Sequence, residues 1–126
     1  MAAYSPTVID HFEHPRNAGE MEDPDGEATT ANPVCGDRMR VMIRVADGTI
    51  DDVRWKTRGC PPAIATSSYS SELVKGWTLE QVEGLTREAI AEGVGGLPAD
   101  KVHCSVLAAD ALRAAVADYR RRRGVT

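Results

Sequence analysis

Three cysteines are the residues of this chain best suited to chemistry, namely Cys35, Cys60 and Cys104. They are 25 and 44 residues apart, so no local finger motif joins them. Cys35 lies on an expected turn, Cys60 directly precedes an expected helix, and Cys104 lies in or just before the first turn of another. The unpaired amides and the dipole at a helix N-terminus favour the thiolate, which is the form of cysteine that binds soft metals.

Three thiolates leave a four-ligand metal site one donor short, and two neighbouring residues could complete it. Asp37 follows Cys35 by two residues, and His103 is adjacent to Cys104. Because Gly36 tolerates backbone angles that other residues avoid, we expect Cys35 and Asp37 to share a tight turn at the end of a sheet. The sequence therefore predicts a metal site built from five residues: Cys35, Asp37, Cys60, His103 and Cys104.

Two simpler interpretations of the same residues remain open at this point. Free cysteines are often small buried hydrophobic residues, and nothing here resembles one C-x-x-C motif paired with a second. Cys104 beside His103 could also indicate nucleophilic catalysis. Residues one apart on a helix do not face each other, however, so His103 and Cys104 make a poor pair of base and nucleophile.

Length and composition favour one acidic domain spanning residues 1–126. The chain has 126 residues, a mass of 13.6 kDa, a net charge of -4 and a pI near 5.3. This balance argues against nucleic acid as a main partner, since phosphate binding needs a basic face. The basic run at residues 120–123 is expected to be a solvated helix end rather than a docking patch.

The remaining composition signals concern the compartment. No segment approaches the roughly 18 apolar residues that a membrane span needs, and the first residues lack the pattern of a signal peptide. An odd number of cysteines fits poorly with a secreted disulfide framework. We therefore expect a cytoplasmic protein with reduced thiols and no membrane partner.

Periodicity predicts a small antiparallel sheet that follows an N-terminal helix. Ser5 and Pro6 are typical of a helix start, and Pro15 should end that helix. A strand is expected at residues 27–31 and an alternating strand at 38–45, with Met42 among the arginines of its polar face. The Asp47–Gly48 pair predicts a hairpin into a returning strand that ends near residues 58–60. Residues 17–26 are expected to form a surface loop.

The second half of the chain predicts helices. One should span residues 63–75, although its middle, residues 66–71, is unusually polar and small, which suggests close packing or a face presented to a cluster or partner. Thr78 with Gln81 resembles a capping box, and Thr86 can cap a second short helix. After a loop at residues 93–98, a long amphipathic helix begins between residues 100 and 105. We expect His11 and His14 to be surface or capping residues.

Three motifs together resemble the signatures of one known family. They are NPVCGD at residues 32–37, GCPPAIATSS at 59–68 and HCSVLA at 103–108. The first residues fit as well, with Tyr4, DHF at 10–12 and PRNAG at 15–19. In order and spacing, nearly the whole chain is similar to the U-type iron–sulfur cluster scaffold family, which comprises IscU and the N-terminal domain of NifU.

The resemblance implies an α+β fold, with a small three-stranded antiparallel sheet and helices packed on one face. It implies a scaffold, not an enzyme, on which a [2Fe–2S] cluster is assembled transiently and passed to acceptor apoproteins. A cysteine desulfurase would supply the sulfur. By position, four residues match those that hold the cluster: Cys35, Asp37, Cys60 and Cys104. His103 joins them as a ligand for Fe or Zn²⁺.

Further partners follow from the resemblance, and an alternative function does too. A frataxin-like protein is a possible partner, and self-association into a homo-oligomer is left open. At residues 97–101 the sequence LPADK departs from the family's chaperone-binding form L-P-P-V-K at Ala99 and Asp100, which weakens the expectation of a dedicated Hsp70-type chaperone. The alternative is a zinc-dependent sulfur acceptor that holds no cluster, but the insertion of that branch is missing between Cys60 and Cys104.

Overall fold

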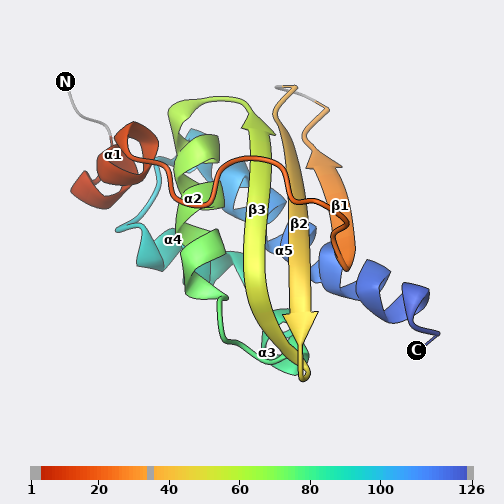
Figure 1. Ribbon diagram of the computed structural model, residues 1–126. Helices are drawn as coiled ribbons and strands as arrows, with labels where there is room; N and C mark the ends of the chain where they lie inside the picture. The colour runs from red at the N-terminus through yellow and green to blue at the C-terminus, as the bar shows by residue number, and fades with distance from the viewer. Residues whose placement is uncertain (1–3, 34–35, 125–126) are drawn as a thin grey trace.

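The computed structural model describes residues 4–33 and 36–124, and its centre is a three-stranded antiparallel sheet in the order β1-β2-β3. The strands are β1 (Gly26–Ala31), β2 (Arg38–Ala46) and β3 (Thr49–Arg58). Asp47 and Gly48 both have positive φ in the hairpin between β2 and β3, as a tight two-residue turn requires. The expected α+β architecture is confirmed (Figure 1).

Helices pack against one face of this sheet and against each other. They are α1 (Pro6–Glu13), α2 (Pro61–Leu73), α3 (Leu79–Glu83), α4 (Arg87–Gly93), the 3-10 helix η1 (Ala99–Lys101) and α5 (His103–Arg122). Figure 1 shows α5 behind the sheet, α2 beside β3 and α1 on the far side of α2. The expected caps are present, because the Ser5, Thr78 and Thr86 side chains each accept a backbone N–H of the following helix.

The core lies between the inner face of the sheet and the helices. Met39, Val41 and Ile43 alternate along β2 and are buried, and they face Leu107 and Leu112 of α5 within one hydrophobic cluster. Full burial of each such side chain contributes about 1.5–3 kcal/mol. The predicted period of two therefore gives the sheet one continuous apolar face.

The outer face of the sheet is not fully open to solvent, contrary to expectation. Met42 was expected on the polar face but is fully buried. The segment expected to be a surface loop crosses this face (Figure 1). The Trp55 amide donates to the Asn17 carbonyl at 3.2 Å, and the Gly19 amide donates to the Trp55 carbonyl at 2.9 Å. Backbone pairing with β3 thus holds the segment on the sheet, which sequence periodicity could not show.

The small polar residues of α2 serve close packing, as expected. Thr66, Ser67, Ser68, Ser70 and Ser71 are all buried. All five hydroxyls are hydrogen-bonded, some to carbonyls of α2 itself and others across an interface, such as the Ser67 Oγ at 2.7 Å from Thr57 Oγ1 on β3. Short side chains allow neighbouring elements to approach, and their hydroxyls stay hydrogen-bonded as buried polar groups must.

The expectation for His11 as a surface residue is wrong. Its side chain is buried between α1 and α2, with Nδ1 at 2.7 Å from the Ser68 Oγ. The ring also lies edge-on to Tyr69, with 5.8 Å between the ring centroids. Burial lowers the pKa of His11, and the nearby Arg16 charge lowers it further. The histidine therefore serves the packing of α1 on α2.

The arginine run that ends α5 is engaged in ion pairs rather than simply solvated. Arg120 Nε lies 2.7 Å from a Glu83 carboxylate oxygen, and Arg122 Nε lies 2.9 Å from the Asp118 carboxylate. Asp118 also accepts a hydrogen bond from the Glu27 amide at 3.0 Å, so the arginine run is linked to β1.

Among the described residues, no helix has the length and apolar character needed to cross a membrane.

Candidate metal and cluster site

The candidate donors come from three places in the sequence and meet at one end of the sheet. Asp37 directly precedes β2, Cys60 is the N-cap of α2 just after β3, and His103 and Cys104 open α5. Because Arg38 is paired with Arg58, β2 begins where β3 ends, at the upper end in Figure 1. The antiparallel pairing therefore brings Asp37 and Cys60 together. Cys35 lies outside the described residues.

Four separations define the geometry of this group. Cys60 Sγ lies 3.5 Å from Asp37 Oδ2 and 3.7 Å from Cys104 Sγ. His103 Nε2 lies 3.4 Å from Asp37 Oδ2 and 3.7 Å from Cys104 Sγ. Donor atoms of Asp37, His103 and Cys104 all lie within 4.8 Å of one another. The structure thus brings together the four predicted ligands that it describes.

These separations fit the edges of a small coordination polyhedron. With metal–ligand bonds of about 2.0–2.3 Å, a tetrahedral Zn²⁺ holds its N, O and S donors roughly 3.3–3.8 Å apart. Four of the six separations among these donors fall in that range, and the mutually close set is Asp37, His103 and Cys104, with Cys60 beside it. Thiolates, imidazole and carboxylate together suit zinc or iron, whereas calcium and magnesium prefer oxygen alone.

Burial opposes ionisation of one thiol in the metal-free chain. Cys104 is fully buried, and this desolvation raises the pKa of its thiol; the adjacent Cys60 raises it further. The expectation that the start of a helix favours the thiolate is therefore wrong for Cys104, because burial outweighs the dipole. A metal that binds here must displace the thiol proton.

The contact between His103 and Cys104 also differs from expectation. Their side chains approach to 3.7 Å although the residues are adjacent on α5. A buried thiol with a raised pKa is still a poor nucleophile, so the structure does not favour Cys–His catalysis.

Two residues near the site were not predicted to be part of it, namely Gly59 and Lys101. A Cβ atom at Gly59 would lie only 2.8 Å from Asp37 Cγ, so the glycine makes room for the carboxylate. The charge of Cys60 raises the pKa of Lys101, so the Lys101 ammonium lies near enough to the site to interact electrostatically with its thiols. A glycine directly before Cys60 was a readable signal, whereas nothing in the sequence pointed Lys101 at the thiols.

A family comparison decides the relationship that the motifs suggested. The sequence model described as the NifU-like N terminal domain matches residues 3–126, which is almost the entire chain. The chain belongs to this family. The resemblance noted from the three cysteine motifs is thereby confirmed.

Relatives of this family member are similar over nearly its whole length. An iron-sulfur cluster assembly scaffold protein IscU of Azotobacter vinelandii is 50% identical over 127 residues, covering 98% of both chains. The protein named IscU 1 in Archaeoglobus fulgidus is 54% identical over 121 residues, covering 96% of this chain and 79% of its own. Both are named as scaffolds rather than as enzymes.

A solved structure supports the fold independently. The N-terminal part of a NifU-like protein from Brucella abortus aligns with a TM-score of 0.76, covering 95% of this chain and 96% of the other. At 19% sequence identity this likeness concerns the fold alone. It agrees with the three-stranded sheet and its helices.

Proposed function

We propose that this chain is a scaffold that assembles a [2Fe–2S] cluster transiently and passes it to acceptor apoproteins. The observation that carries the proposal is the meeting of Asp37, Cys60, His103 and Cys104 at one end of the sheet. Scaffold proteins of the same family are about half identical to this chain over nearly its full length, which supports the same role here.

The cargo would be held by Cys35, Asp37, Cys60 and Cys104, with His103 beside them. Cys35 precedes Asp37 by two residues in the sequence. Thiolates are the usual ligands of iron–sulfur clusters. A carboxylate is a harder and weaker partner for such a cluster. We therefore hypothesise that Asp37 keeps the cluster labile enough to be transferred.

The same proposal extends to partners and compartment. The protein acts in the cytoplasm as one domain over residues 1–126, without catalysis of its own. A cysteine desulfurase delivers sulfur to a cysteine of the site, and acceptor apoproteins take the finished cluster. A frataxin-like protein is a further candidate partner. The acidic net charge of -4 supports a role without nucleic acid.

A second candidate function is a zinc-dependent sulfur relay that holds no cluster. It is favoured by one specific observation, namely four donor–donor separations of 3.4–3.7 Å, each of which suits an edge of a tetrahedral zinc site. In the scaffold proposal, zinc would be an alternative occupant of the same donors.

The deciding experiment is anaerobic reconstitution with iron, cysteine and a cysteine desulfurase. The measurements are visible absorption and the counts of iron and sulfide bound. We expect a chromophore with equal iron and sulfide, absent from Cys35→Ala, Cys60→Ala and Cys104→Ala. His103→Ala is compared with His14→Ala, because His14 is exposed and far from the site along the chain. Protein persulfide with bound zinc and no chromophore would instead establish the relay.

A further inference from the structure

Four cations lie together on the outer face of the sheet, at the end that carries the candidate site. Arg38 and Arg40 are alternate residues of β2, and Lys56 and Arg58 are alternate residues of β3. In the strand register, Arg38 pairs with Arg58 and Arg40 pairs with Lys56. Cross-strand partners share a face, so the four side chains form two rows of two on that face. We call this set the sheet-end basic surface.

The two pairs of this surface differ in how they are neutralised. Arg40 contacts Glu20 at 3.1 Å and Glu27 at 2.9 Å, and Lys56 contacts Glu20 at 3.2 Å. Arg38 and Arg58 are exposed, and within the described part of the chain neither forms an ion pair. Like charges directly opposite each other destabilise a sheet. An uncompensated arginine pair in a chain of net charge -4 therefore needs a reason outside stability.

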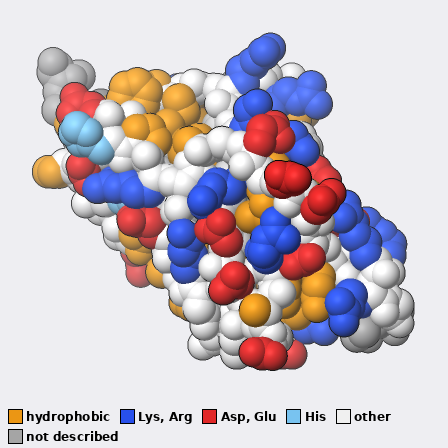
Figure 2. All heavy atoms as spheres, in the orientation of Figure 1, with side chains coloured by type: hydrophobic (Ala, Val, Ile, Leu, Met, Phe, Trp, Pro, Cys, Tyr) orange, Lys and Arg blue, Asp and Glu red, His pale blue; other side chains and the backbone are white. Residues whose placement is uncertain are grey.

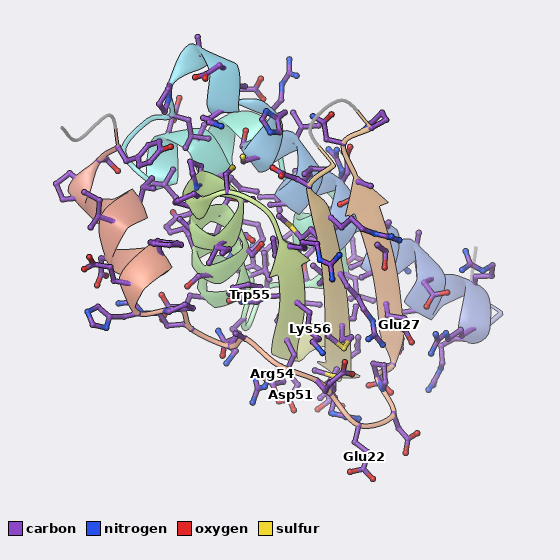
Figure 3. The ribbon with its side chains drawn as sticks, turned by 90° about the horizontal axis from the view of Figure 1, so that it is seen from above. Glu22, Glu27, Asp51, Arg54, Trp55 and Lys56 are labelled. Atoms are coloured by element: carbon purple, nitrogen blue, oxygen red, sulfur yellow. The ribbon has the colours of Figure 1, made fainter. Side chains whose placement is uncertain are left out.

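The surface is hollowed as well as charged. A depression of about 450 Å³ is lined by Thr29, Arg38, Arg40, Lys56, Thr57 and Arg58. Figure 2 shows Lys and Arg side chains gathered at the upper end of the sheet, above a region where acidic and basic side chains are mixed. In Figure 3, Lys56 and Glu27 lie on the side of the sheet that faces away from the helices. The hollow is thus open to a partner.

We propose that the sheet-end basic surface docks an acidic segment of a partner protein beside the candidate cluster site. Arg38 directly follows Asp37, and Arg58 precedes Cys60 by two residues, so a docked partner lies next to the donors. Its role in loading or unloading the cluster rests on the proposed scaffold function. The docking itself requires only the charges of the surface.

The chemistry of the surface selects carboxylates on a polypeptide. Guanidinium groups pair with carboxylates through two parallel hydrogen bonds. Alternate residues of a strand are about 6.6–6.8 Å apart, so an extended segment with acidic residues at alternate positions can place one carboxylate at the Arg38–Arg58 pair and the next toward Arg40 and Lys56. There it competes with Glu20 and Glu27. Of the four cations, only Arg38 and Arg58 are left without an ion pair among the described residues. Two charges suit a short acidic segment rather than the long phosphate backbone of a nucleic acid, which needs an extended basic face.

The test measures how tightly the protein binds a fluorescently labelled synthetic peptide in which glutamate and threonine alternate. Binding is detected as a rise in fluorescence anisotropy at low salt. The test uses the full metal-free chain under reducing conditions, so the result does not depend on cluster formation. The test variant is Arg38→Gln/Arg58→Gln. The matched control is Arg87→Gln/Arg123→Gln, which changes the net charge equally at exposed positions on α4 and after α5.

We expect saturable binding that weakens as salt is added and falls about tenfold in Arg38→Gln/Arg58→Gln, equivalent to about 1.4 kcal/mol, with the control unchanged. The same variant should melt no lower than the wild type, because a repulsive pair is removed. Absence of saturable binding, or an equal loss in the control, would overturn the proposal. So would stronger competition by inorganic pyrophosphate or a single-stranded DNA oligonucleotide than by unlabelled peptide.

The two proposals fail in different ways. If Arg38→Gln/Arg58→Gln still forms the chromophore but loses the peptide, both proposals stand. If no variant or wild-type protein forms a cluster while the peptide still binds selectively, only the scaffold function fails. If the cluster forms and the peptide never binds, only the docking proposal fails.

Discussion

Gly59→Ala tests the position of the Asp37 carboxylate, which is the least conventional donor of the candidate site. The structure leaves no room for a methyl group at residue 59. An added Cβ would lie 2.8 Å from Asp37 Cγ, 2.9 Å from Asp37 Oδ1 and 3.1 Å from Ala63 Cβ. Since ordinary contacts begin at 3.4 Å, the carboxylate or the backbone of residue 59 must give by about 0.6 Å to restore one.

That movement has a structural and a functional cost. Overpacking of this kind costs about 1–3 kcal/mol. Alanine has less backbone freedom than glycine in the unfolded chain, which offsets about 0.4–1 kcal/mol of this loss of stability. The shift also changes the separations of Asp37 Oδ2 from Cys60 Sγ, now 3.5 Å, and from His103 Nε2, now 3.4 Å. If Asp37 keeps the cluster labile, its displacement should lengthen the cluster's lifetime.

The assay is the decay of visible absorption after reconstitution, read beside a thermal melt. We expect a cluster lifetime several times longer in Gly59→Ala and longer still in Asp37→Ala; tenfold would correspond to about 1.4 kcal/mol in the barrier to loss. Gly84→Ala is the matched control. A Cβ at Gly84 meets its nearest atom at 3.7 Å, so it should leave the lifetime unchanged and the stability equal or slightly higher.

Two results would refute this reasoning. A wild-type lifetime and melting temperature in Gly59→Ala would show that Asp37 does not lie against residue 59. Faster cluster loss in both Gly59→Ala and Asp37→Ala would show that the carboxylate retains the cluster instead of making it labile.

Three further predictions concern stability. Gly93→Ala should destabilise the fold by about 1–3 kcal/mol and lower the melting temperature by several degrees, because its Cβ would lie 2.0 Å from Tyr69 Oη and 2.3 Å from Cζ. Burial lowers the pKa of His11 below 6.5 in the folded state, so the unfolded state binds more protons there. Stability should therefore fall as pH drops from about 6.5 through the folded pKa, and urea titrations should show a flatter pH dependence in His11→Asn. Zn²⁺ at about 100 times its dissociation constant should add about 2.7 kcal/mol to the free energy of unfolding, raise the melting temperature, and lose this effect with chelator or in Cys60→Ala.

Each of these predictions has its own control and contrary result. Gly84→Ala controls for Gly93→Ala, and equal melting temperatures in the two variants would contradict the clash. His14→Asn controls for His11→Asn, and a pH slope in His11→Asn equal to the wild type's would exclude His11 as the titrating group. Retention of the full zinc effect in Cys60→Ala would place the ion elsewhere.

Much of the architecture could be predicted from local sequence patterns. The alternation through Met39, Val41 and Ile43 predicted β2, and Asp47–Gly48 predicted the hairpin, because backbone preference and face periodicity are properties of neighbouring residues. Arrangements that depend on distant contacts were missed. The neighbours of His11 and Met42 in the sequence did not predict that either side chain is buried. His11 is covered by α2, and Met42 lies on the face of the sheet that the segment before β1 crosses.

The sequence by itself determined which elements form, to which family the chain belongs, and which residue types are available as donors. Only the tertiary structure decided that Asp37, Cys60, His103 and Cys104 meet, with four of their donor–donor separations at 3.4–3.7 Å. It also decided that burial would raise the pKa of Cys104 against the helix dipole, and that Arg38 would face Arg58 across the strands. Distances and desolvation arise when segments far apart in the chain pack together, and no local pattern encodes them.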